Sequence, residues 1–179
     1  MMQLIEAQTE TQLKNIEDLY LRAFPKAERK PFSMILKMRD AGISEILLLE
    51  EEDGRFAGLV ITLAYKDLVL LDYFAIDDAK RGMGIGSAAL ALLQKRYRGK
   101  RFFLEIESTV DHEIEERVRR KRFYQAAGMG PMNYLVDLFG VEMEIMTFEC
   151  KVAFEEYHEI FEELFPKKFA DRICFVREI

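Results

Sequence analysis

A glycine-rich loop that joins an apolar segment to an amphipathic one constrains the fold of this chain most. Residues 68–76 are nearly all apolar, which predicts a strand buried on both faces. Residues 77–86 form the loop, with glycine at alternate positions from Gly82 to Gly86. Residues 85–97 then carry apolar side chains at helical spacing. The pattern predicts a strand–loop–helix unit in the middle of the chain.

The glycines of this loop favour a bound ligand over a plain tight turn. Glycine adopts positive φ and lets a ligand approach the backbone closely. Free N–H groups at a helix start bind phosphate oxygens, aided by the positive end of the helix dipole. We therefore expect the loop to cradle a pyrophosphate.

The rest of the chain predicts one α+β domain over residues 1–179 with a mixed, mostly antiparallel sheet. The segment after the loop should form one central parallel crossover, right-handed as such units are. We expect strands at residues 2–7, 45–50, 56–64, 68–76, 101–107, 134–137, 141–147 and 172–176, and helices from Thr9 or Thr11 to Pro25, from Pro31 to Gly42, from 85 to 99, from 113 to 127 and from 154 to 166.

Composition narrows the class of protein. The formal net charge is −6, which is unusual for a nucleic-acid-binding protein. Two cysteines without metal-ligand spacing suit a cytoplasmic protein without a structural metal. The N-terminus does not resemble a signal peptide, and the longest apolar stretch is too short for a membrane span. We expect neither a nucleic acid nor a membrane as partner.

One phosphate-binding alternative is a dinucleotide site. Gly84-x-Gly86-x-x-Ala89 fits the G-x-G-x-x-A pattern, and Glu105 or Glu107 follows about twenty residues later. That fingerprint belongs to a doubly wound parallel sheet. The flanking antiparallel hairpins and the single crossover expected here disfavour it.

Three segments together point to a known family. Arg81-x-x-Gly84-x-Gly86 matches the motif R/Q-x-x-G-x-G/A, and residues 70–76 before it resemble that family's fourth strand. Residues 122–129 resemble its F-Y-x-x-x-G-F segment. Over nearly its whole length the chain resembles the GNAT superfamily of N-acetyltransferases. The resemblance implies a GNAT-like twisted sheet flanked by helices, and acetyl-CoA as co-substrate without a metal.

The resemblance also implies the residues that bind the donor. The Phe74 amide would donate a hydrogen bond to the thioester carbonyl and to the oxyanion formed from it, which lowers the barrier by ~3 kcal/mol. Strand residues would line the pantetheine arm and loop amides would hold the pyrophosphate. The expected cofactor-binding residues are Phe74, Ala75, Ile76, Arg81, Gly82, Met83, Gly84, Ile85, Gly86 and Ser87.

Tyr124 corresponds to the family's general acid. A phenol within hydrogen-bond reach of the sulfur would protonate the departing thiolate. The alternative is a core aromatic near a helix end. The chain departs from the family at two positions: Arg117 replaces a common Asn, and Met129 replaces a Phe.

Several carboxylates are candidates for the general base. Asp72 is the one charge in the apolar strand and shares a strand face with Leu70, where the family often carries a glutamate. Glu105 and Glu107 on the next strand are rivals. Our candidate catalytic residues are therefore Tyr124, Asp72 and Glu107, with a water-mediated route or a purely structural role for each carboxylate as the alternative.

The sequence thus predicts a small bacterial-type acetyltransferase that moves an acetyl group from acetyl-CoA to a primary amine by direct attack. The acceptor, a small molecule or a peptide, is not identified; we expect Tyr20, Phe24, Glu28 and Arg29 to line its site. The alternative from another class is a non-enzymatic acyl-CoA-binding regulatory module. The basic run at residues 117–122 is either a solvated helix face or a contact for the 3′-phosphate of CoA. We expect a homodimer.

Overall fold

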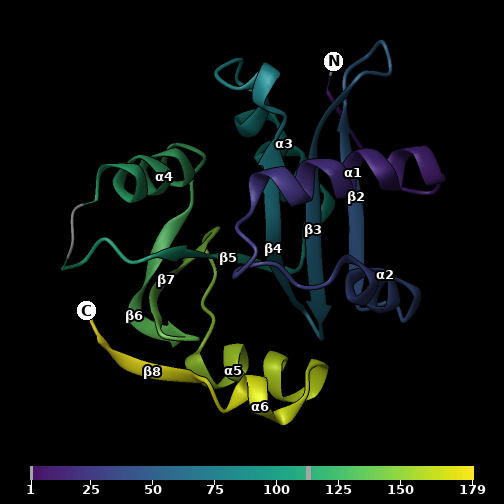
Figure 1. The fold of residues 1–179 in the computed structure, drawn as a ribbon. Coiled ribbons are helices and arrows are strands. Elements are labelled where there is room, and N and C mark those ends of the chain that lie inside the picture. The colour runs from purple at the N-terminus through teal and green to yellow at the C-terminus, as the bar shows by residue number, and fades with distance from the viewer. Residues whose placement is uncertain (1, 112–113) are drawn as a thin grey trace. The chain divides into compact units, whose positions relative to one another are not determined.

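The computed structural model describes residues 2–111 and 114–179, and contacts group the chain into two compact units (Figure 1). The first contains the residues up to Ala64 together with Val69–Arg98, and the second contains Tyr65–Leu68 together with Gly99–Ile179. The first unit is built from β1 (Gln3–Glu6), α1 (Glu10–Ala23), α2 (Phe32–Asp40), β2 (Ser44–Glu50), β3 (Phe56–Tyr65), β4 (Leu68–Ile76), the 3₁₀ turn η1 (Asp78–Lys80) and α3 (Ile85–Arg96). The second is built from β5 (Arg101–Glu107), α4 (Glu115–Ala126), β6 (Gly130–Leu138), β7 (Val141–Thr147), α5 (Phe154–Leu164), α6 (Lys167–Ala170) and β8 (Ile173–Glu178).

The first unit is a sheet with strand order β1-β2-β3-β4 and helices on its faces. β2 pairs antiparallel with both β1 and β3. Helices α1 and α2 cover one face, where they pack on alternate residues of β2, β3 and β4 (Figure 1). Helix α3 lies against the other face, because the Tyr97 hydroxyl at its end is 3.0 Å from Thr62 Oγ1 of β3. This core has the members Ala7, Ile16, Leu19, Tyr20, Phe32, Ile35, Ile46, Leu48, Leu59, Ile61, Tyr73 and Ala75.

Nearby residues set both ends of helix α1. Thr9 is its N-cap and forms a capping box with Gln12, which satisfies two N–H groups of the helix start. The helix ends at Ala23, two residues before Pro25. Pro31 is the N-cap of α2 rather than its first residue, a shift of one position from our expectation.

The second unit is an antiparallel sheet with strand order β5-β7-β6-β8. Its charged core residue is Glu144 of β7, whose side chain is fully buried. That carboxylate accepts hydrogen bonds from the Thr109 amide (2.8 Å), the Thr109 hydroxyl (3.0 Å) and Lys121 Nζ (2.5 Å). The network fastens the segment after β5 and helix α4 to the sheet.

Most expected elements are present, with some corrections. Residues 68–76, 101–107 and 141–147 are strands with the expected bounds. β6 begins at Gly130 rather than at residue 134, and the short helix α6 was not expected. The expected start of the fourth helix, Glu113, lies outside the described residues.

The expectation that β4 is buried on both faces holds for only part of it. Leu68 to Leu71 are buried, whereas Asp72, Phe74 and Ile76 are half-buried. Polar atoms and backbone near that end of the strand are therefore accessible, which an all-apolar pattern does not reveal.

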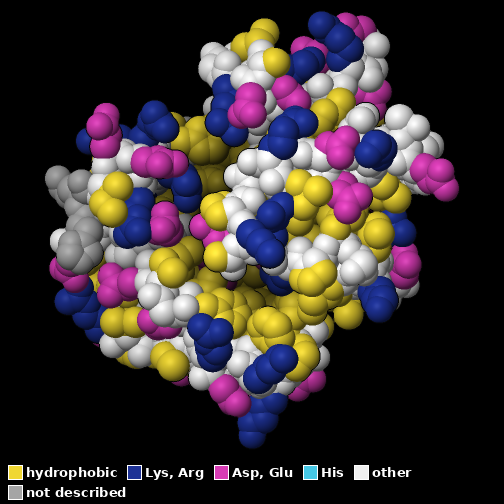
Figure 2. All heavy atoms as spheres, in the orientation of Figure 1, with side chains coloured by type: hydrophobic (Ala, Val, Ile, Leu, Met, Phe, Trp, Pro, Cys, Tyr) yellow, Lys and Arg dark blue, Asp and Glu magenta, His cyan; other side chains and the backbone are white. Residues whose placement is uncertain are grey.

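Charged side chains of both signs alternate over the face drawn in Figure 2, without a field of one sign. Among the described helices, none is long and apolar enough to cross a membrane.

Candidate active site

The glycine loop has the backbone geometry of an anion cradle. Gly82 and Gly84 have φ of +77° and +76°, the left-handed region that favours glycine. Gly84 is the N-cap of α3 and offers no side-chain cap, so the first N–H groups of the helix have no partner within the helix. A Cβ at either glycine would meet nothing within 4 Å among the described residues. The loop therefore leaves backbone N–H groups without a helical partner beside open space; that they bind phosphate oxygens stays a prediction.

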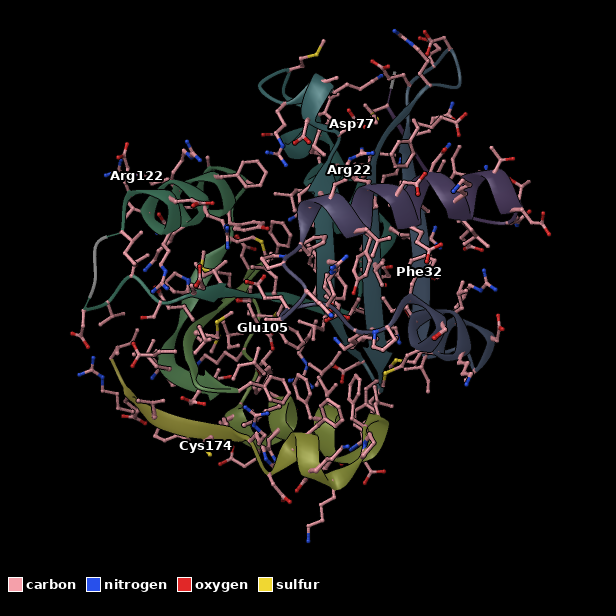
Figure 3. All side chains as sticks on the ribbon, viewed as in Figure 1. Arg22, Phe32, Asp77, Glu105, Arg122 and Cys174 are labelled. Carbon is pink, nitrogen blue, oxygen red and sulfur yellow. The ribbon has the colours of Figure 1, made fainter. Side chains whose placement is uncertain are left out.

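Neighbouring side chains hold this loop in place. In Figure 3, Arg22 of α1 lies beside Asp77, and their nearest side-chain atoms are 3.4 Å apart. Asp77 also caps η1, accepting a 3.0 Å hydrogen bond from the Ala79 amide. Arg81 is exposed and pairs with Asp78 at 2.9 Å, so a phosphate would have to draw its guanidinium away from that carboxylate.

The end of β4 turns the backbone of Phe74 and Ile76 away from β3. The Asp77 amide donates to the Ala57 carbonyl at 2.9 Å, and N–H groups of a strand alternate between its two sides. Ala75 thus faces β3 and its two neighbours face the opposite side.

Gly58 of β3 makes this arrangement possible. A Cβ built on it would lie 2.5 Å from the Ala75 carbonyl oxygen, closer than real Cβ atoms come. Any larger residue would push β4 away from β3. The sequence pattern did not single out this glycine, because the requirement comes from a strand met later in the chain.

Asp72 is paired with a lysine that sequence reasoning missed. Lys30 Nζ lies 2.7 Å and 2.9 Å from the two carboxylate oxygens of Asp72, and also 5.1 Å from the centre of the Tyr73 ring. The Asp72 side chain is 9 % exposed and that of Lys30 is 21 % exposed. The expected base is therefore held in an ion pair that is mostly shielded from solvent.

Two tyrosines fix the segment that carries Lys30. The Tyr20 hydroxyl donates to the Lys30 carbonyl at 2.9 Å, the Lys30 amide donates to the Tyr73 hydroxyl at 3.1 Å, and that hydroxyl donates to the Glu28 carbonyl at 2.9 Å. Burial raises the pKa of Tyr20 far above its usual value, so its hydroxyl stays protonated as a donor. Tyr20 is fully buried, which corrects our expectation that it lines an acceptor site.

Tyr124 lies near the end of α4 with its ring buried against Phe123, 5.1 Å between ring centres. Burial raises its pKa to about 12, so the hydroxyl is protonated at neutral pH. Its hydroxyl has no hydrogen-bond partner within the part of the chain that the structure describes. A protonated phenol with an unused donor suits a general acid; the role stays a prediction.

Glu107 is held by two arginines of α4. Arg117 donates to it at 2.9 Å and Arg120 lies 3.8 Å from its other oxygen. This pairing explains what Arg117 does where the family commonly has Asn. Its rival Glu105 accepts a hydrogen bond from the Tyr157 hydroxyl, a structural role inside the second unit.

The basic run of α4 is mostly engaged in ion pairs. Arg117, Arg120 and Lys121 pair with Glu107, Glu116 and Glu144, which favours the interpretation as a structural helix. Arg122 is exposed and projects from α4 in Figure 3.

Comparison with known proteins decides the family. The family model described as the GNAT acetyltransferase family matches residues 13–129, more than half of the chain. The chain belongs to the GNAT acetyltransferase family. Its resemblance on the Arg81 motif and the residues 122–129 is thereby confirmed as a family relationship, and the chain is an acetyltransferase of the kind that acts on amines with acetyl-CoA as co-substrate.

Solved structures of this family share the fold. A protein from Bacteroides thetaiotaomicron assigned to the GNAT family superposes with a TM-score of 0.76 at 21 % identity, covering 95 % of this chain and 98 % of that one. A variant of the Vibrio cholerae spermidine N-acetyltransferase gives 0.64 at 13 % identity, covering 82 % and 94 %. An Escherichia coli N-acetyltransferase for a ribosomal-protein alanine gives 0.58 at 17 % identity, covering 86 % and 98 %. No curated protein sequence matches significantly.

These findings confirm the α+β GNAT fold, with β4, the glycine loop, α3 and β5 in the expected order. The antiparallel strands of the first unit are not the doubly wound parallel sheet that the dinucleotide alternative requires. Among residues 2–111 and 114–179, no group of three potential metal ligands is close enough to hold an ion.

Proposed function

We propose that this acetyltransferase binds acetyl-CoA along β4 and the glycine loop and transfers the acetyl group to a primary amine by direct attack. The observation that carries the proposal is the left-handed Gly84 at the start of α3, which follows a strand whose Phe74 and Ile76 amides point away from β3. The amides at residues 83–87 would bind the pyrophosphate oxygens. Arg81, once released from Asp78, would add a guanidinium.

The Phe74 amide is our proposed donor to the thioester oxygen. It points away from β3, and its position is fixed because Ala75 is held against Gly58. A fixed donor stabilises the negative charge that develops on that oxygen better than water, which must reorient. Ala75 and Ile76 would line the pantetheine arm.

Tyr124 is our proposed acid for the leaving thiolate. A hydroxyl with a pKa of about 12 keeps its proton at neutral pH and can transfer it as the carbon–sulfur bond breaks. Direct attack needs no cysteine; Cys150 and Cys174 lie outside the motifs, and Cys174 is on β8 in the second unit.

The base is Asp72 or Glu107, and their surroundings differ. Asp72 has one lysine partner and lies on the strand that carries Phe74, whereas Glu107 has two arginine partners on α4. Matched variants, Asp72→Asn and Glu107→Gln, separate them. Replacing the true base is expected to lower the rate of thiol release while acetyl-CoA still binds, and the other variant is expected to keep its rate.

Acetyl-CoA binding is the first test. Thermal unfolding is measured with acetyl-CoA, and with NAD and ATP as controls. Ligand at ~100 times its dissociation constant adds about 2.7 kcal/mol of stability. A shift with acetyl-CoA alone is expected, and its absence, or a shift with NAD alone, overturns the proposal.

A screen for released thiol then identifies the acceptor. Polyamines and peptides with a free amino terminus come first, because the structurally similar enzymes named above include acetyltransferases for spermidine and for a protein alanine. Binding of acetyl-CoA without thiol release for any amine would favour the regulatory module instead.

A further inference from the structure

We propose that Lys30 is itself an acceptor and that the protein acetylates its own Lys30 side chain. The inference rests on the proposed function, since the acetyl group comes from acetyl-CoA bound beside β4. The observation behind it is that the ammonium group of Lys30 forms an ion pair with Asp72. Asp72 lies two residues before Phe74 on the same strand.

Strand geometry places this amine near the proposed reaction centre. Side chains of residues two apart in a strand lie on one face, about 6.6 Å apart along it. Asp72 and Phe74 therefore share a face, and the backbone N–H groups of both point away from β3. The four-carbon stem of Lys30 can carry Nζ from the Asp72 carboxylate toward Phe74.

Several contacts fix both the backbone and the ammonium group of Lys30. Both backbone polar groups of Lys30 are bound by tyrosine hydroxyls, from Tyr20 and Tyr73. Its ammonium lies over the Tyr73 ring and contacts both oxygens of Asp72. Carboxylate and aromatic face together form an ammonium-binding position. Holding the amine there raises its effective concentration at the thioester far above that of a free amine.

The chemistry balances with the groups in place. The Lys30 ammonium passes one proton to Asp72, and the resulting amine attacks the acetyl carbonyl carbon, forming the N–C bond. The C–S bond breaks and its electron pair leaves on sulfur. The nitrogen then loses its second proton and the sulfur takes up one proton, so the products are acetyl-lysine, CoA thiol and one proton released from Asp72 to solvent.

The product changes the site electrostatically. Acetylation removes the charge of Lys30 and with it the ion pair to Asp72. The carboxylate is then left to bind the ammonium of an external acceptor. Before acetylation, the Lys30 ammonium occupies Asp72 and competes there with the ammonium of an external acceptor.

The test follows acetylation of the full chain with acetyl-CoA by intact mass and peptide mapping. Lys26 is the matched control, because it lies in the same connector but is exposed. Lys30 is expected to be labelled at least ~100-fold faster than Lys26, the range of general-base catalysis, at a rate constant independent of protein concentration. Asp72→Asn is expected to slow the labelling of Lys30 by a similar factor, and Lys30→Arg to abolish it while circular dichroism shows an intact fold.

The outcomes separate this inference from the proposed function. If acetyl-CoA raises the melting temperature but Lys30 is labelled no faster than Lys26, self-acetylation is overturned and the function stands. If acetyl-CoA neither binds nor labels, both are overturned. A labelling rate constant proportional to protein concentration would overturn the intramolecular step.

Discussion

Replacing Lys121 by Met tests the buried ion pair of the second unit. The Glu144 carboxylate is fully buried, and Lys121 is its cationic partner at 2.5 Å. Without Lys121 the carboxylate keeps, among the described residues, the two neutral donors of Thr109. Removing one partner of a buried pair costs about 3–5 kcal/mol, because a charge stays buried without compensation. That is a large share of the ~5–15 kcal/mol typical of a domain.

Urea unfolding followed by circular dichroism measures this loss. With a slope of about 2 kcal/mol per molar urea, the midpoint is expected to fall by about 2 M with the slope unchanged. Arg122→Met is the control on the same helix, since Arg122 is exposed, and is expected to stay within about 0.5 kcal/mol. Glu144→Gln in the Lys121→Met background should restore stability, because the amide keeps an acceptor for Thr109 and carries no charge. A loss below ~1 kcal/mol for Lys121→Met would refute the reasoning that Glu144 is desolvated.

Two further predictions concern the donor side and the acid. Tyr124→Phe is expected to lower the rate of thiol release about 100-fold or more while leaving the acetyl-CoA-induced thermal shift intact; unchanged turnover would remove Tyr124 from catalysis. Because its pKa is about 12, wild-type activity should show no loss attributable to Tyr124 below about pH 11, and a general acid is lost only as pH rises through its pKa. Gly58→Ala is expected to destabilise by about 1–3 kcal/mol and to weaken acetyl-CoA binding, since its Cβ meets the Ala75 carbonyl at 2.5 Å. Gly130→Ala, with nothing near its Cβ among the described residues, is the control, and an equal effect of the two changes would contradict the steric argument.

Local patterns in the sequence predicted the parts of the site that a short segment fixes alone. The strand at residues 68–76, the loop glycines and the helix after them depend on hydrophobic period, on backbone freedom at Gly82 and Gly84, and on capping. Each involves neighbours within a few residues. Such features can be predicted from the sequence before the fold is known.

The partners of charged side chains were not predictable in the same way. Lys30 meets Asp72 across 42 positions of sequence, and Tyr157 meets Glu105 across 52. Asp72 is the one carboxylate of β4, whereas β5 carries both Glu105 and Glu107, and the sequence could not tell which cation each would receive. The extra helix α6 spans only four residues, too few for a periodic signal.

By itself, then, the sequence determined the class of fold, the glycine loop and the family, because these depend on hydrophobic period, glycine positions and spacing along the chain. Only the tertiary structure decided that Gly58 must lack a side chain, that Tyr124 is buried enough to keep its proton, and that Lys30 sits on Asp72. The physical reason is that burial and electrostatic pairing depend on distances between segments, which folding alone sets.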